Sequence, residues 1–304
     1  MPAILFACPR CRAPLQQITP DEVFCAADGL RFMRLNGVWR FLLPGRSVYY
    51  EKFTREYETV RRAEGRGPQE PSYYRSLPYQ DLSGRMPAAW GIRAASFDMF
   101  LKRVLTPLEG SSRLLQVLDL GAGNGWFSNR LAGRGHALIA VDLMSNDFDG
   151  LGCQRFYETG FTSVQAEFDR LPIEDNQFDL VIFNASLHYS INIRETLAES
   201  LRVLAGTGKI VVLDSPVYRD AGSGAQMVQE REFQFMKQFG FPSNALPSEN
   251  YLTYARLDEL AAALGLKWQF ITPFYGFNWA LRPFLSKIRG SRKPARFHVI
   301  VGSR

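Results

Sequence analysis

The stretch that decides the fold is Val117-Leu118-Asp119-Leu120-Gly121-Ala122-Gly123-Asn124-Gly125-Trp126-Phe127. It begins as a short apolar run typical of a buried strand, continues with three glycines at alternate positions, and leads into a predicted helix at 128–132. Glycines let a backbone turn tightly and approach a ligand closely, and the amides at a helix start attract negative charge. The stretch therefore predicts a strand, turn and helix that hold the polar end of a ligand.

A second apolar run, 137–141, ends in Asp142, whose carboxylate can accept hydrogen bonds from the hydroxyls of a ribose. The loop follows the same logic as the dinucleotide fingerprint G-x-G-x-x-G, but its own spacing is Asp-x-Gly-x-Gly-x-Gly. An acid placed one strand after a glycine loop indicates a ligand that contains a nucleoside.

These residues resemble the class I S-adenosylmethionine-dependent methyltransferases, and within them the broad type 11 group. The first match is 119–125 with Asp142, and the second is the run 171–181, which reads LPIEDNQFDLV. The resemblance covers 114–216 well, the remaining C-terminal part more loosely and the first hundred residues poorly. It implies an α/β fold with a doubly wound, mostly parallel, seven-stranded Rossmann-like sheet, and S-adenosylmethionine (AdoMet) as the cofactor.

The resemblance also implies a set of cofactor-binding residues at the ends of the first four strands of that sheet. The loop residues Asp119, Gly121, Ala122, Gly123 and Gly125 would surround the methionine, Asp142 the ribose, and Glu167 with Phe168 the adenine, and Leu143 and Asn184 complete the set. Many relatives have Asp where this chain has Glu167. In relatives, a segment near 88–105 folds over the methionine, so Arg93 or Tyr73 is expected to meet its carboxylate. The alternative is that such residues only pack the segment onto the sheet.

His188 follows the fourth predicted strand, at the edge of the sheet where ligands of open α/β sheets bind. It is the candidate catalytic acid or base. Methyl transfer is an in-line displacement that depends mainly on alignment, and a base is needed only when the acceptor must lose a proton early. A structural or cofactor-side role for His188 therefore stays open.

Three cysteines near the N-terminus have the spacing of a metal site. Cys8 and Cys11 form a Cys-x-x-Cys pair, which directs both sulfurs at one point, while Cys25 is followed three residues later by Asp28 instead of a fourth cysteine. The segment resembles the small zinc-ribbon modules that precede some methyltransferase domains. The alternatives are a zinc site of three cysteines and one aspartate, or a ribbon that has lost its metal.

We expect three regions along the chain. A zinc-ribbon-like module spans 1–45, a helical linker and cofactor-covering segment 46–112, and the methyltransferase domain 113–304, with a lid insertion at 217–249. A run rich in glycine and proline, 65–71, is predicted to separate the ribbon from the enzyme. The lid is predicted to hold a helix at 226–239 and to shape the acceptor pocket, with Phe233, Phe235 and Phe241 facing either the substrate or the domain.

The hydrophobic and charge patterns exclude some classes of protein and leave others open. No apolar run reaches the ~20 residues of a membrane span, and the N-terminus lacks a secretion signal, so we expect a cytoplasmic protein. The net charge is +6, and 281–304 holds seven basic residues and no acid. Such a run is usually solvated, but its aromatic residues and charge keep a polyanion or a membrane surface in consideration.

The sequence is best interpreted as an AdoMet-dependent methyltransferase that acts on a small molecule of natural-product or lipid type. One alternative is a ribosomal-RNA methyltransferase, because some of these also carry an N-terminal zinc module. Another is a catalytically silent AdoMet-fold protein that acts as a binding partner. The long aromatic lid and the departure at Asp28 favour the small-molecule acceptor. The oligomeric state cannot be inferred.

Overall fold

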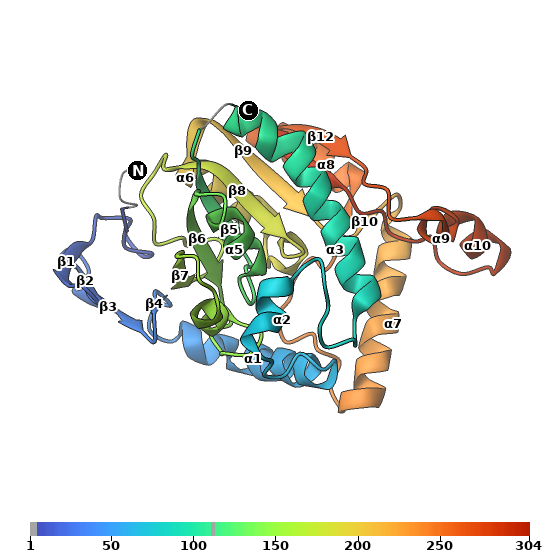
Figure 1. Ribbon diagram of the computed structural model, residues 1–304, viewed down its shortest axis with the longest axis horizontal. Coiled ribbons are helices and arrows are strands. Elements are labelled where there is room, and N and C mark those ends of the chain that lie inside the picture. Colours follow the sequence, from blue (N-terminus) through green and yellow to red (C-terminus); the bar gives the residue numbers. More distant parts are fainter. Residues whose placement is uncertain (1–4, 111–112) are drawn as a thin grey trace.

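The computed structural model describes residues 5–110 and 113–304, and its central feature is one mixed sheet of eleven strands (Figure 1). The strand order is β1-β2-β3-β4-β7-β6-β5-β8-β9-β13-β12. Its strands are β1 (Gln16–Thr19), β2 (Glu22–Cys25), β3 (Leu30–Leu35), β4 (Val38–Arg40), β5 (Gln116–Leu120), β6 (Ala137–Asp142), β7 (Thr162–Gln165), β8 (Phe178–Asn184), β9 (Leu204–Leu213), β12 (Lys267–Ile271) and β13 (Val299–Ser303).

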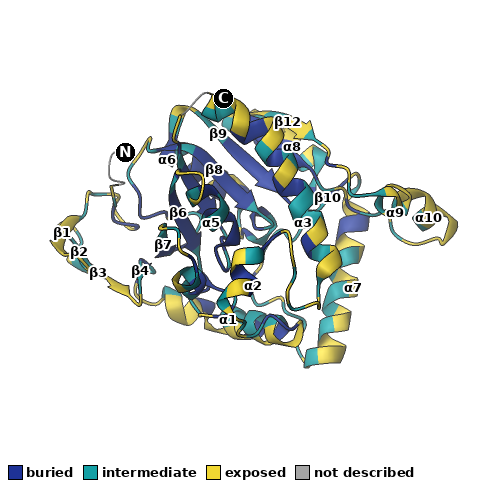
Figure 2. Ribbon diagram, viewed as in Figure 1, coloured by how far each residue is buried: buried dark blue, intermediate teal, exposed yellow. Residues whose placement is uncertain are grey.

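The centre of the sheet is parallel, as the alternation of apolar runs and helices predicts. β7, β6, β5, β8 and β9 pair in parallel, whereas β13 and β12 pair antiparallel at one edge. The central strands are buried on both faces, which is typical of a parallel sheet covered by helices. Figure 2 shows this as a dark centre between exposed ends.

Helices cover both faces of the sheet, so that alternate residues of each strand belong to different cores. Val117 packs in a cluster with α3 (Pro87–Phe100) and α5 (Trp126–Ala132), while Leu118 packs in a cluster with α6 (Ile193–Val203) and α8 (Tyr254–Leu264). This period-two division confirms the doubly wound arrangement. The remaining helices are α1 (Arg46–Ala63), α2 (Pro71–Ser76), α4 (Thr106–Glu109), α7 (Ala221–Phe239), α9 (Phe277–Ala280) and α10 (Arg282–Ile288), with a π-helical turn at Leu101–Leu105 and short 3-10 turns at Leu151–Phe156 and Leu187–Tyr189.

The prediction of a seven-stranded, mostly parallel sheet is wrong in two respects. Four N-terminal strands extend the sheet beyond the predicted seven, and half of the neighbouring strand pairs are antiparallel. The extension begins where β4 pairs in parallel with β7, with Val38 opposite Ser163 and Arg40 opposite Gln165. Hydrophobic periodicity predicts that a strand exists but does not predict its partner, so this pairing could not be expected from the sequence.

The run 65–71 does not separate the N-terminal strands from the rest of the chain. Arg66 is 7% exposed and its guanidinium lies 4.0 Å from the carboxylate of Asp149, so this segment packs against the domain. Glycine and proline mark the turn correctly, but a turn can be packed as closely as a helix.

The insertion after β9 forms a helix, as predicted, but a longer one. α7 begins at Ala221, where the Asp220 side chain accepts a hydrogen bond from the amide of Ser223, and it ends before Gly240 in a left-handed conformation. The short strands β10 (Val217–Tyr218) and β11 (Leu252–Thr253) pair at its base. Thr253 caps α8, and its side chain accepts a hydrogen bond from the amide of Arg256. No helix among the described residues combines the length and the apolarity that crossing a membrane requires.

Candidate functional site

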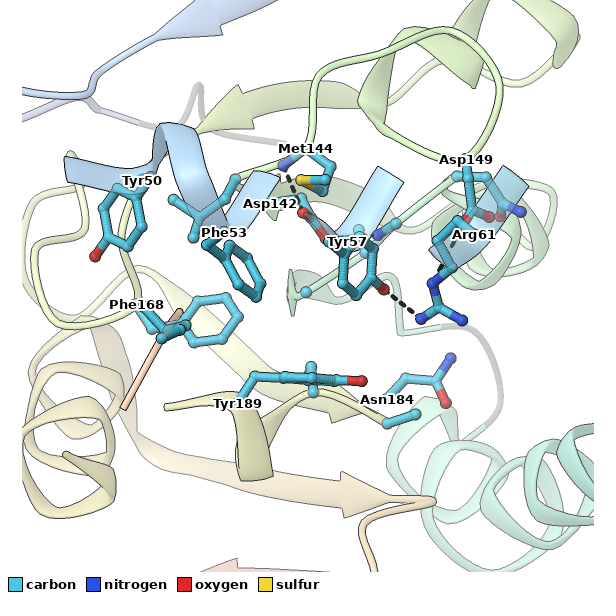
Figure 3. A pocket seen from close by; sticks show the side chains of 18 of the residues that line it. Tyr50, Phe53, Tyr57, Arg61, Asp142, Met144, Asp149, Phe168, Asn184 and Tyr189 are labelled. Carbon is cyan, nitrogen blue, oxygen red and sulfur yellow. Dashed lines mark hydrogen bonds and ion pairs between the residues drawn. The ribbon is translucent and has the colours of Figure 1, made fainter. Parts of the chain in front are cut away.

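The main cavity lies at the carboxyl ends of the central parallel strands and is also lined by residues of α1 and α3 (Figure 3). Its non-atom space, including the part that is open to solvent, is about 1070 Å³. Of the predicted cofactor-binding residues, nine line it: Gly121, Ala122, Gly123, Asp142, Leu143, Glu167, Phe168, Asn184 and Arg93. These residues lie at the ends of four strands and on one helix, and they converge only in the fold.

The glycine loop after β5 forms one wall of the cavity, and its backbone requires glycine. Gly121, Gly123 and Gly125 have φ values of 80°, 55° and 80°, a left-handed region that other residues rarely adopt. A Cβ at Gly121 would also collide with the Cβ of Ser186, so no side chain fits there. The loop therefore exposes its backbone to whatever fills the cavity.

Asp142, at the end of β6, is tied to this loop. Its Oδ2 accepts a hydrogen bond from the amide of Gly123 at 2.8 Å, and its Oδ1 accepts one from the amide of Met144 at 2.7 Å. Burial raises the pKa of Asp142 to about 6 although both amides favour the charged form. The carboxylate is thus held at the cavity wall with lone pairs left for a ligand's hydroxyl groups.

Glu167, just after β7, is oriented by two residues of α1. The Nε of Arg46 (2.9 Å), its Nη2 (2.5 Å) and the hydroxyl of Tyr50 (2.8 Å) all donate to Oε1 of Glu167. Oε2 accepts no hydrogen bond from the described residues, and Glu167 lines the cavity. The structure therefore adds Arg46 and Tyr50 to the site as positioning residues that the sequence did not single out.

The opposite end of the cavity is rich in arginine. Arg61, Arg66 and Arg93 line it together with the single acid Asp149, whose carboxylate lies 3.5 Å from Nε of Arg61. Arg93 stacks on the ring of Trp90, and burial together with the neighbouring arginines lowers its pKa to about 10. Arg93 remains charged at neutral pH and is therefore suited to bind a carboxylate.

Three predicted site residues do not line the cavity. Asp119 is fully buried beneath the loop, where it accepts a hydrogen bond from Ser128 and where burial raises its pKa to about 7. Gly125 caps the start of α5 and packs near Phe161. Both residues support the loop without lining the cavity. A sequence motif contains such supporting residues as well as those that contact the ligand, and it does not indicate which are which.

His188 is the third of these residues. Its Nδ1 lies 3.2 Å from the hydroxyl of Ser215, and its ring packs against Tyr189, which does line the cavity. Burial, with Arg231 and Arg61 nearby, lowers the pKa of His188 to about 3, so the imidazole is neutral at neutral pH. The geometry favours the structural role over the acid or base, and Tyr189 is the residue of this turn that reaches the cavity.

Four of the lining side chains that were not predicted from the sequence come from α1. Tyr50, Phe53, Tyr57 and Arg61 line the cavity along one face of this helix, as Figure 3 shows for all four. Their helical spacing is visible in the sequence. The spacing predicts an apolar face but does not indicate whether that face packs on a sheet or covers a cavity.

A smaller cavity adjoins the main one under the predicted lid, and we call it the annex. It shares Phe53, Tyr57, Arg61, Tyr189 and Leu246 with the main cavity and adds Arg231 and Phe235 of α7. The Nε atoms of Arg61 and Arg231 are buried and have no hydrogen-bond partner among the described residues. Phe233, by contrast, is 73% exposed and points away, and Phe241 stacks on Phe239 without lining either cavity.

The predicted metal-binding residues converge in space. One ligand atom from each of Cys8, Cys11, Cys25 and Asp28 lies within 4.8 Å of the other three. Cys8 and Cys25 are buried, and all four cysteines of the chain are free of disulfides. Three thiols and one carboxylate at such short distances form a donor set that fits Zn²⁺.

Comparison with known proteins identifies the central part of the chain. Residues 118–212 match the family model described as "Methyltransferase domain". A malonyl-[acyl-carrier protein] O-methyltransferase of Buchnera aphidicola is 30% identical over 131 residues, which are 40% of this chain and 51% of that protein. A ubiquinone/menaquinone biosynthesis C-methyltransferase of Azotobacter vinelandii is 26% identical over 159 residues, 46% of this chain and 62% of that protein.

Among solved structures, a 1,6-didemethyltoxoflavin-N1-methyltransferase of Burkholderia thailandensis aligns with 95% of this chain and 97% of its own, at 15% identity and a TM-score of 0.48. The chain spans about half the length of the curated relatives it matches. The matched segment is similar to a methyltransferase domain, and the relatives named above are described as methyltransferases.

Proposed function

We propose that this protein is an AdoMet-dependent methyltransferase with a small-molecule acceptor. The observation that carries the proposal is the main cavity, in which the glycine loop, Asp142 and Glu167 meet at one edge of the sheet. The matched methyltransferase domain contains all three of these elements. A cavity with two acids and a bare backbone loop fits a ligand that has a ribose, an adenine and a charged end.

In this proposal each part of the cavity binds one part of AdoMet. Asp142 accepts hydrogen bonds from the ribose hydroxyls, and Oε2 of Glu167 accepts one from the adenine amino group. Arg93 pairs with the methionine carboxylate at the arginine-rich end. When bound, AdoMet supplies a methyl group on a sulfonium, so the chain's own task is to align the acceptor with that methyl group and to exclude water.

The annex is our candidate for the acceptor site. It shares five lining residues with the main cavity, and its walls combine the aromatic rings of Phe53, Tyr57 and Phe235 with two arginines. An aromatic cavity of this kind suits a small molecule better than a structured RNA, which would need an open basic surface. The named relatives act on small or carrier-bound molecules, which supports the same choice.

The proposal can be tested before the acceptor is identified. Purified protein is incubated with AdoMet labelled in its methyl group and with cell extract separated into small molecules, protein and RNA. We expect the label to appear in the small-molecule fraction. Label in RNA would favour the ribosomal-RNA alternative, and tight AdoMet binding without label in any fraction would favour the silent binding protein.

We further propose that Cys8, Cys11, Cys25 and Asp28 hold a structural zinc ion. Elemental analysis of the purified protein should find about one equivalent of zinc, and Cys11→Ser should lose it. Cys153→Ala removes a cysteine outside the cluster and should retain the metal. A chelator should increase hydrogen exchange in β1–β3 but leave AdoMet binding intact, because the cavity is lined by residues from Tyr50 onward. Metal-free protein with protected β1–β3 amides would contradict the proposal.

A further inference from the structure

The segment from Phe277 to Ile288 forms an almost continuous helix that projects from the body of the protein, at the far end from β1 (Figure 1). Leu281, between α9 and α10, itself has helical dihedral angles, and its carbonyl accepts a hydrogen bond from the amide of Leu285 at 3.0 Å. We call this segment the projecting helix. Its twelve residues correspond to a length of about 18 Å.

The projecting helix exposes its apolar residues to solvent. Phe277 is 79% exposed, Leu281 51%, Phe284 62% and Ile288 66%. These positions recur at intervals of four, three and four, so they lie along one stripe of the helix. Figure 2 shows the projecting helix as exposed, in contrast with the buried strands. Large apolar side chains gathered in one exposed stripe indicate a surface that binds a partner.

The opposite side of the same helix faces the protein. Trp279 packs on Phe297 with ring centroids 5.6 Å apart, and the guanidinium of Arg282 lies 4.0 Å above the Trp279 ring. Arg292, just beyond the helix, pairs with Glu230 of α7. The contacts of Trp279 and Arg292 thus hold the projecting helix against the protein, and its apolar stripe lies on the side away from these contacts.

Positive charge flanks the apolar stripe. At 100° per residue, Lys287 falls on one side of the stripe and Arg289 on the other. The ion pairs of this region use Arg292 and Lys293, and neither Lys287 nor Arg289 has an acidic partner among the described residues. The sequence has no Asp or Glu after Glu259. A helix with an apolar stripe bordered by basic residues is suited to lie in the interface of a membrane.

We propose that the projecting helix docks this protein on the surface of a bilayer that contains anionic lipid. The apolar stripe would enter the boundary between headgroups and acyl chains, and Lys287 and Arg289 would contact anionic headgroups. A second copy of the chain fits less well, because pairing two such stripes would bring basic residues against basic residues. A nucleic acid fits less well, because Leu281 and Ile288 offer neither charge nor an aromatic face to it.

Flotation of the purified full-length protein with vesicles tests this proposal. We expect binding to vesicles of phosphatidylcholine and phosphatidylglycerol, and at least about tenfold weaker binding to phosphatidylcholine alone. The double variant Phe277→Glu/Phe284→Glu should reduce binding to the mixed vesicles at least about tenfold, because it places charge in the apolar stripe. Val48→Glu on α1 is the matched control, since Val48 is equally exposed (72%) but lies elsewhere, and it should bind as the wild type does.

A second variant separates the two parts of the surface. Lys287→Glu/Arg289→Glu should abolish the preference for phosphatidylglycerol and leave the weak binding to phosphatidylcholine unchanged. Circular dichroism and AdoMet calorimetry verify that each variant is folded. Equal flotation of wild type and the Phe277/Phe284 variant would overturn the proposal. So would a wild-type dimer that this variant converts to monomer in the absence of lipid, because the stripe would then be a self-association surface.

Discussion

Replacing Asp142 by alanine should lower the affinity for AdoMet at least about tenfold. The variant would lose charge-assisted hydrogen bonds to the ribose, each worth about 1.5–3 kcal/mol. It would also release the amides of Gly123 and Met144, which Asp142 holds at 2.8 and 2.7 Å, so that the glycine loop loses its fixed position. Isothermal calorimetry with AdoMet and with its demethylated product measures the effect directly.

The matched control is Asp147→Ala. It removes an exposed carboxylate from the segment that follows β6, and it breaks only a surface ion pair with Arg155. This control should bind AdoMet within about twofold of the wild type, as expected for a surface pair. If the folded Asp142 variant also bound within that range, Asp142 would not contact the cofactor and the assignment of the cavity would fail.

The same residue predicts how cofactor binding depends on pH. Burial raises the pKa of Asp142 to about 6, so the carboxylate is charged at pH 7.5 and mostly protonated at pH 5. A protonated carboxyl group accepts fewer hydrogen bonds, and AdoMet affinity of the wild type should therefore fall as the pH decreases through 6. In Asp142→Ala this part of the pH dependence should be absent.

The sequence predicted the parallel centre of the fold because its signals are local. β8 begins within the run 171–181, and the acid-terminated run at 137–141 becomes β6 with Asp142 as its last residue. Strand partners beyond this centre were not predictable. The pairing of β4 with β7 joins residues more than a hundred positions apart, and no local pattern encodes which edge of a sheet an additional strand will occupy.

The residues of the candidate site also fall into two groups, those that local sequence signals indicated and those that depend on long-range contacts. Residues at the ends of strands, such as Gly121 and Asn184, were expected from the resemblance to a family, and the parallel sheet brings these strand ends to one edge. Arg46 and Tyr50 were missed, because their contact with Glu167 depends on how α1 crosses that edge. His188 was chosen for its chemistry and its place in the turn, but the turn directs Tyr189 into the cavity instead.

The acceptor site should respond to substitutions in α7 that leave the cofactor site untouched. Phe235 lines the annex, whereas Phe233, two residues earlier on the same helix, is 73% exposed. Phe235→Ala should reduce kcat/KM for the acceptor by about 30-fold or more, because an aromatic wall that buries a ligand contributes about 2 kcal/mol. The loss should appear mainly in KM for the acceptor, since the ring binds acceptor and transition state alike.

Phe233→Ala is the matched control, and it should keep kcat/KM within about twofold of the wild type. AdoMet affinity should be unchanged in both variants, because neither residue lines the main cavity.

A different pattern would identify RNA as the acceptor. Turnover would then be insensitive to Phe235→Ala, would fall steeply with salt as phosphate contacts are screened, and would be weakened by replacing Arg289, Arg292 and Lys293 with alanine. Because Phe235 lines the annex and those three basic residues lie outside both cavities, the two sets of variants distinguish a small acceptor from a nucleic acid.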